Sequence, residues 1–208
     1  MKSSRSPAVV SAAFDEPNLI ADAGLVPLVR LAERCGLPEL VAREVRIGGA
    51  ANSAGAHPAA KGMSLVAAMC AGADSIDDAD RLRHGAMHRL FTGVRAPSTL
   101  GTSLRAFTHG HNQLQAVHRM FLARLARHTP LLPGAEKVAF VDVDPTHRRV
   151  YGRAKQGAEV GRFKGQRTLH PILATLSTPL ARPVLAAVRL RRGKAAAPAG
   201  PPRSPPRP

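Results

Sequence analysis

Through residues 1–134, apolar positions recur at the three- and four-residue spacing that places them on one face of a helix. Gly and Pro residues divide this pattern into short segments, and residues 48–62 are rich enough in Gly and Ala to predict a loop. Ser75, with Asp78 three residues later, resembles a capping box. Helices are expected over Asp22–Gly36, Pro38–Val45, Met63–Ala71 and Ser75–Leu82, and in a long helical region between Pro97 and Pro130.

The pattern changes at Glu136, where apolar runs with strand character begin. Strands are expected over 138–144, around 148–152, over 171–177 and over 183–190, with a basic, Gly-punctuated stretch between the second and the third. This order predicts an antiparallel meander with a long basic connection. The expected fold class is therefore α+β. We expect residues 1–134 to form a helical region, residues 135–194 a β domain, and residues 195–208 a disordered tail of Pro, Ala and Arg.

Two acids on the first expected strand, Asp142 and Asp144, are the leading candidates for chemistry. Because side chains alternate across a strand, both carboxylates project from the same face. An unpaired carboxylate is costly away from water, so either a bound metal or a solvent-open sheet edge is needed to explain the pair. Mg²⁺ prefers carboxylate oxygens, but two acids on one strand give an incomplete site that needs further ligands.

The charge of the chain points to a polyanionic partner. Thirty Lys and Arg against fourteen acids give a formal net charge of +16, which favours binding to nucleic acid. A GC-rich coding sequence would also enrich Arg and Ala without any function. The candidate phosphate-binding side chains are the cations of the expected basic connection: Arg148, Arg149, Arg153, Lys155, Arg162, Lys164 and Arg167. The alternative is that this stretch is only a solvated loop.

The cysteines, the hydropathy and the histidines bear on the cellular compartment and on metal chemistry. Cys35 and Cys70 lack metal-ligand spacing and are expected to be buried hydrophobes in a reducing cytoplasm. No apolar stretch reaches the ~18 residues of a membrane span, so no membrane partner is expected. His84 and His88 are four residues apart, but no Glu completes a metalloprotease pattern, and polar surface is the expected role.

The ordered motifs together resemble the N-terminal half of a DDE transposase from a bacterial insertion sequence, over about residues 18–194. The motifs are Ala96–Leu100, Asp142-Val143-Asp144-Pro145-Thr146, Lys155-Gln156-Gly157-Ala158, His170–Thr175 and Arg189–Gly193. The resemblance implies an RNase H-like domain in which three acids hold two Mg²⁺ ions for cleavage and transfer of DNA strands. It implies that Asp144 is the first catalytic acid and a metal ligand, with Asp142 a weaker candidate for metal binding. It also implies that the N-terminal helices bind the terminal inverted repeats of the element.

The chain departs from the family pattern at Pro145, Arg162 and Thr168, and its motifs give way at Ala195 to low complexity. The expectation is a truncated, frameshifted copy with an incomplete RNase H-like meander, lacking the second and third acids and inactive alone. Its partners would be element-end DNA, a second copy, or an intact transposase. The alternatives are a repressor that occupies the repeats, a basic nucleic-acid-binding protein without catalysis, and a degraded product that does not fold.

Overall fold

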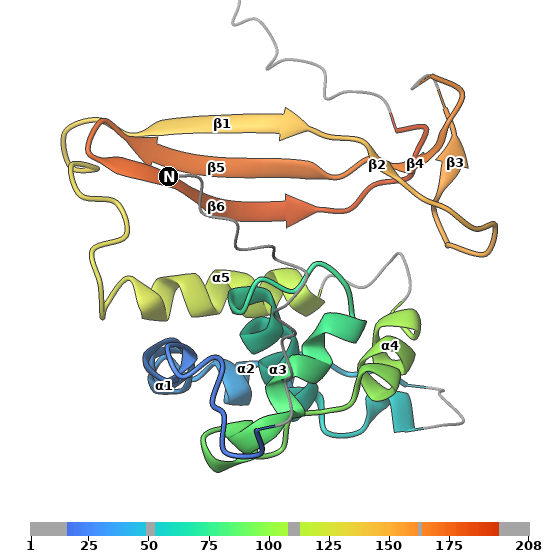
Figure 1. Ribbon diagram of the computed structural model, residues 1–208. Coiled ribbons are helices and arrows are strands. Elements are labelled where there is room, and N and C mark those ends of the chain that lie inside the picture. The colour runs from blue at the N-terminus through green and yellow to red at the C-terminus, as the bar shows by residue number, and fades with distance from the viewer. Residues whose placement is uncertain (1–15, 49–52, 108–112, 162–163, 196–208) are drawn as a thin grey trace, which may run out of the picture.

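The computed structural model describes residues 16–48, 53–107, 113–161 and 164–195, and it is an α+β structure. The helices are α1 (Leu25–Arg34), α2 (Leu37–Glu44), α3 (Pro58–Cys70), α4 (Pro97–Arg105) and α5 (Gln113–Leu125), with three short 3-10 helices, η2 (Ser53–Gly55), η3 (Asp77–Arg83) and η4 (Gly85–Arg89). The strands are β1 (Phe140–Pro145), β2 (Arg148–Arg149), β3 (Glu159–Val160), β4 (Arg167–Leu169), β5 (Ile172–Thr178) and β6 (Ala181–Arg189). Figure 1 shows the helices gathered on one side, with the three-stranded sheet above α5 and a smaller sheet at its far end.

Two clusters of buried apolar side chains form the core of the helical region. One centres on Leu82, Met87 and Leu100, and the other joins Leu40 and its neighbours to Val117 of α5. The expected helices are present, but α3 begins at Pro58, so the loop expected over 48–62 is wrong for its last five residues. Pro is tolerated in the first helical turn, and Ala is the best helix former. Sequence signals that resembled a loop are therefore compatible with a helix start.

Gly62 lies inside α3 where the helix meets α2. A Cβ at this position would come within 3.0 Å of Val41 Cγ1, a separation at which one side chain must move. Gly62 therefore lets the two helices approach closely, which explains a glycine that otherwise suggests a loop. Of the two cysteines, Cys35 is buried as expected, but Cys70 is exposed at the end of α3, so the prediction of burial is wrong there.

The predicted capping box at Ser75 is present, although the helix that it opens is of the 3-10 type. The backbone N–H groups of Asp74 and Ser75 donate to Asp78 Oδ2, at 3.1 and 2.7 Å. The Asp78 N–H is directed back at Ser75 Oγ at 3.4 Å. The hydrogen bonds from Ser75 lower the pKa of the Asp78 carboxyl. Reciprocal capping of this kind satisfies donors that a helix start leaves without partners.

The strands form two three-stranded antiparallel sheets, with the orders β1-β5-β6 and β2-β4-β3. Asp144 lies opposite Leu173, and Arg148 lies opposite Leu169. Three residues on each side lie between these two pairs, so a single register runs from β1 into β2 and from β4 into β5. The strands expected over 138–144 and around 148–152 are both present, as β1 and β2. The expected meander is corrected at this point, because the chain does not reverse between them. The chain reverses between β2 and β4 and again between β5 and β6.

The larger sheet meets the helical region along one edge. β6 contacts α5, whereas β1 is the opposite edge strand and lies farthest from the helices (Figure 1). Among the described residues, no helix has the length and apolar character needed to cross a membrane. Arg162 and residues 196–208 of the expected tail lie outside the described residues.

Candidate nucleic-acid interface

Asp142 and Asp144 lie on β1, and both side chains are exposed to solvent. They alternate with Val141 and Val143, so the two carboxylates share one face of the strand, as the sequence predicts. The sequence left two explanations for this acid pair, a bound metal and a solvent-open sheet edge. The structure supplies the solvent-open edge. Water solvates both carboxylates, and no buried charge has to be compensated.

Pro145 closes β1 without disturbing its pairing to β5. The Thr146 N–H donates to the Pro171 carbonyl at 2.9 Å, so Thr146 occupies a hydrogen-bonded position of the ladder. Neighbouring positions alternate in an antiparallel pair, which directs the nitrogen of Pro145 toward the open edge. A proline is tolerated there, because that edge requires no N–H donor. Pro145 also prevents an added strand from pairing at this position.

A Mg²⁺ site of the kind that the resemblance implies requires more than this pair. Two-metal phosphoryl-transfer sites place one ion beside the attacking oxygen and one beside the leaving oxygen, and each ion needs several oxygen ligands. In the described parts of the chain, no group of three or more His, Cys, Asp or Glu side chains is placed to hold a metal ion. Asp142 and Asp144 alone do not fit a complete two-metal centre.

Two histidines mark the junction between the two sheets, and sequence reasoning assigned them no role. His147 and His170 occupy opposite positions in the shared register, with ring centroids 4.1 Å apart and planes 8° from parallel. The Arg191 Nε–H donates to the His170 carbonyl at 3.2 Å. Burial lowers the pKa of His147, and the nearby charges of His170 and Arg191 lower it further. The junction therefore favours a neutral His147.

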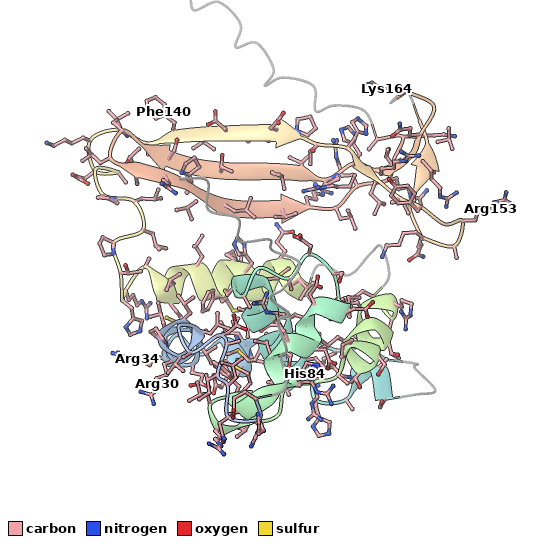
Figure 2. The ribbon with its side chains drawn as sticks, viewed as in Figure 1. Arg30, Arg34, His84, Phe140, Arg153 and Lys164 are labelled. Carbon is pink, nitrogen blue, oxygen red and sulfur yellow. The ribbon has the colours of Figure 1, made fainter. Side chains whose placement is uncertain are left out.

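The candidate cations of the basic stretch gather on and around the small sheet. We call residues 148–161, 164–169 and 189–195 the basic unit. Arg148, Arg149, Arg153, Lys155 and Lys164 are exposed in it. Figure 2 shows Arg153 and Lys164 projecting from the end of the molecule away from the helices. Arg167 differs, because its guanidinium donates to the carbonyls of Arg153, at 2.9 Å, and Lys155, at 3.3 Å. Arg167 thus braces the loop that presents the other cations.

Close backbone packing ties the two ends of the basic unit together. The Gly193 N–H donates to the Gly157 carbonyl at 3.0 Å, and the Lys194 N–H donates to Glu159 Oε2 at 3.2 Å. A Cβ on Gly193 would overlap the Thr168 carbonyl oxygen and the backbone of Glu159. The Lys155–Ala158 and Arg189–Gly193 motifs are therefore parts of one structural unit.

This packing adds cations that sequence reasoning did not assign to the interface. An open hollow of about 470 Å³ is lined by Arg189, Arg191, Arg192 and Lys194, with Glu159 at its side. The Arg-rich run that ends β6 is visible in the sequence, but only the fold brings it beside residues 155–159. From 145 to 195 the sequence holds twelve Lys and Arg and a single acid, Glu159. From 16 to 134 it holds thirteen Lys and Arg and nine acids.

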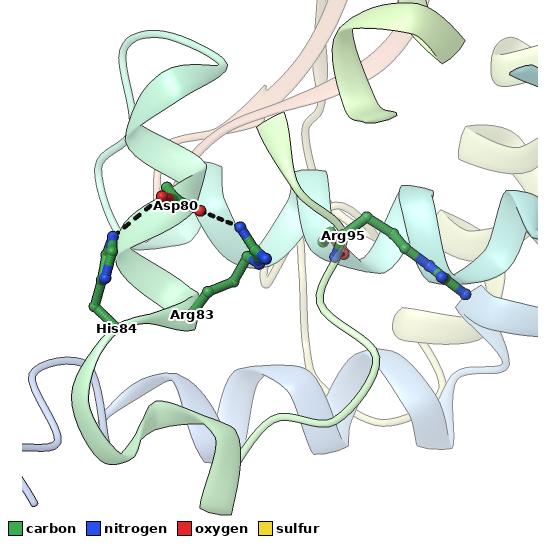
Figure 3. Close-up of polar contacts among 5 residues, drawn as sticks. Asp80, Arg83, His84 and Arg95 are labelled. Atoms are coloured by element: carbon green, nitrogen blue, oxygen red, sulfur yellow. Dashed lines mark hydrogen bonds and ion pairs between the residues drawn. The ribbon is translucent and has the colours of Figure 1, made fainter. Parts of the chain in front are cut away.

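Three acids in the helical region, Asp22, Glu44 and Asp80, form ion pairs with its cations. Figure 3 shows Asp80 between Arg83 and His84, and the His84 Nε2 lies 3.1 Å from Asp80 Oδ2. The hydrogen bond from Arg83 is the main reason that the pKa of Asp80 is lowered. His84 and His88 are both exposed, as expected for polar surface. These contacts leave the basic unit as the stronger cationic surface.

Comparisons with protein-family models, with curated proteins and with solved structures found no match to this chain.

Proposed function

We propose that the protein binds DNA through the basic unit, as a DDE-transposase-like protein directed at the terminal inverted repeats of an insertion sequence. The observation that carries this proposal is the concentration of exposed cations in one braced unit containing a single acid. Such a surface binds phosphates through Lys and Arg and releases counterions when it does so. Phosphate contacts set affinity and register, whereas sequence choice requires contacts to bases.

The order of the strands supports the transposase part of the proposal. In the larger sheet the first strand, β1, pairs with the second, β5, and the second with the third, β6, as in the meander that an RNase H-like domain requires at its start. Asp144, at the end of the first strand, is then the proposed first catalytic acid, with Asp142 beside it. Mg²⁺ would supply charge stabilisation at the scissile phosphate. This chain contributes two exposed carboxylates toward such a site.

The solvent exposure of both acids favours a second candidate, a non-catalytic repressor. A carboxylate pair on a sheet edge requires no metal to be stable, so the chain can occupy the repeats without cutting them. The test is incubation of the purified protein with Mg²⁺ and repeat DNA, followed by gel analysis of the strands. The repressor proposal expects no products. Cleavage that is abolished by Asp144→Asn would establish the catalytic role instead.

The DNA-binding proposal is tested with two pairs of charge-matched variants. Arg148→Gln/Arg153→Gln alters exposed cations of the basic unit, and Arg30→Gln/Arg34→Gln removes the same charge from α1 (Figure 2). Each phosphate contact contributes about 0.9 to the slope of log affinity against log salt. The first variant should therefore lower that slope by roughly 2, while the second should leave it close to wild type.

Equal losses in both variants would mean that binding follows net charge and not the basic unit. A loss confined to the α1 variant would move the interface to the helices, as the family resemblance implies for repeat recognition. Affinity for repeat DNA and for random DNA is measured for every variant. Equal affinity for repeat DNA and random DNA would contradict the proposed recognition of inverted repeats and leave general DNA binding.

A further inference from the structure

Among the residues of the basic unit that the structure describes, Tyr151 is the one exposed aromatic ring. It follows β2 directly, and 74% of its surface is open to solvent. The Arg149 Cζ lies 4.7 Å from the centre of the ring. The two residues are two positions apart on an extended segment, so their side chains fall on the same side of the backbone. A guanidinium therefore covers part of the ring and leaves most of it accessible.

The exposure of this ring is unfavourable for folding by itself. Aromatic side chains bury large apolar areas when they contribute to a core, and this chain has only six Phe, one Tyr and no Trp. A cation–π contact at an exposed site offsets only part of that loss. The chain therefore places its single Tyr where it adds little to stability but lies beside the Arg149 guanidinium.

The backbone around the ring is restrained on both sides. The Val150 N–H donates to the Arg167 carbonyl at 2.9 Å, immediately before the ring. The Arg167 guanidinium holds the carbonyls of Arg153 and Lys155 just after it. The ring and the neighbouring phosphate-binding side chains are therefore carried on one braced segment. Such preorganisation reduces the entropy that binding would otherwise cost.

We propose that Tyr151, supported by Arg149, is a stacking platform for an unpaired DNA base. This inference rests on the proposed DNA-binding function and specifies its substrate class. Single-strand binding proteins combine aromatic rings for bases with a basic groove for phosphates. The faces of a paired base inside a duplex are covered by its neighbours, so the platform selects single-stranded DNA or the unpaired end of a duplex.

The composition of the chain provides a direct probe of this contact. Tyr151 is the only Tyr and there is no Trp, so tyrosine emission reports on this ring alone. The protein is titrated with a single-stranded oligonucleotide, with its blunt duplex, and with the duplex carrying a short single-stranded overhang. Stacking is expected to quench the emission with the single strand and the overhang but not with the blunt duplex.

Variants separate stacking from charge. Loss of one stacked base corresponds to roughly a 5- to 150-fold lower affinity, so Tyr151→Ala should weaken single-strand binding by that factor and leave duplex binding unchanged. Tyr151→Phe keeps the ring and should retain affinity. Arg153→Gln should weaken binding to the single strand and the duplex alike. Circular dichroism verifies that each variant folds, and the exposure of Tyr151 makes loss of folding unexpected.

Each remaining outcome has a defined meaning. Equal affinity for single strand and duplex, without quenching, overturns the stacking platform and leaves DNA binding in place. No binding to any of the three DNA substrates overturns both proposals. Tighter binding of single-stranded RNA than of the same DNA sequence overturns the assignment to DNA, because the 2′-hydroxyl would then be part of recognition.

Discussion

The helical and β regions of this protein are held together by different forces. In the helical region, Leu40, Leu82, Met87 and Leu100 are at most 1% exposed, within two apolar clusters. On β1, by contrast, Val141 and Val143 are 65% and 57% exposed. Strand pairing and close backbone packing therefore hold the β region, while apolar burial holds the helices. The two regions also differ in charge. Acids balance cations among the helices, but acids are nearly absent from residues 145–195.

Truncation of one apolar side chain in each region tests this division, and it should give the largest change in stability. Leu100→Ala removes a fully buried side chain and should cost about 2–5 kcal/mol of unfolding free energy. Val141→Ala removes a side chain that is mostly in water and should cost about 0.5 kcal/mol or less. Urea unfolding followed by circular dichroism gives both values. Similar losses in the two variants would show that β1 is covered in solution.

Gly193→Ala tests whether backbone packing holds the basic unit. The new Cβ would meet the Thr168 carbonyl oxygen and the Glu159 backbone, neither of which is a flexible side-chain end. Overpacking of this kind costs about 1–3 kcal/mol. Hydrogen exchange should therefore become faster in β3 and β4 while the helices keep their protection. Gly24→Ala is the matched control, because nothing lies within 4 Å of a Cβ placed there. Unchanged exchange in β4 would contradict the proposed packing.

The helices were predictable because their information is local. A period of three and four residues identifies the buried face of each, and Ser75 with Asp78 identifies one start. The start of α3 was missed because Gly62 serves packing against Val41, which no local pattern shows. The strand runs and their antiparallel pairing were predictable by the same local logic, but the register of that pairing was not. That β1 and β2 share one register depends on β4 and β5, whose paired residues lie 19 or more positions further along the chain.

The candidate site divides in the same way. The shared face of Asp142 and Asp144 follows from strand alternation, and the cations of the basic stretch are visible in the sequence. Two features are non-local and were missed: the Arg167 guanidinium turned inward to brace a loop, and the Arg-rich end of β6 placed beside residues 155–159. The His147–His170 stack depends on the same long-range register.

Acidification should loosen the β region before the helices. Burial, with the charges of His170 and Arg191, lowers the pKa of folded His147 below its ordinary value of 6.5. Between the lowered pKa and 6.5 the unfolded chain therefore binds more protons, and stability rises with pH across that window. Acidification from neutral pH should cost stability until the folded pKa is passed. Hydrogen exchange at β2 and β4 measures the effect, and His147→Gln should flatten it. A pH dependence that survives this substitution would assign the effect to another group.

The smallest expected effect concerns the acids of β1, which also decide how the β region is interpreted. Asp144→Asn changes an exposed group on an open edge, so the unfolding free energy should shift by about 0.5 kcal/mol or less. If the pair does not bind metal, Mg²⁺ should raise the melting temperature of the wild type and the variant equally. A ligand that binds only the folded state stabilises it in proportion to its occupancy. Stabilisation by Mg²⁺ that Asp144→Asn removes would therefore show that the carboxylates form a cation site, and β1 would then be held by more than its pairing with β5.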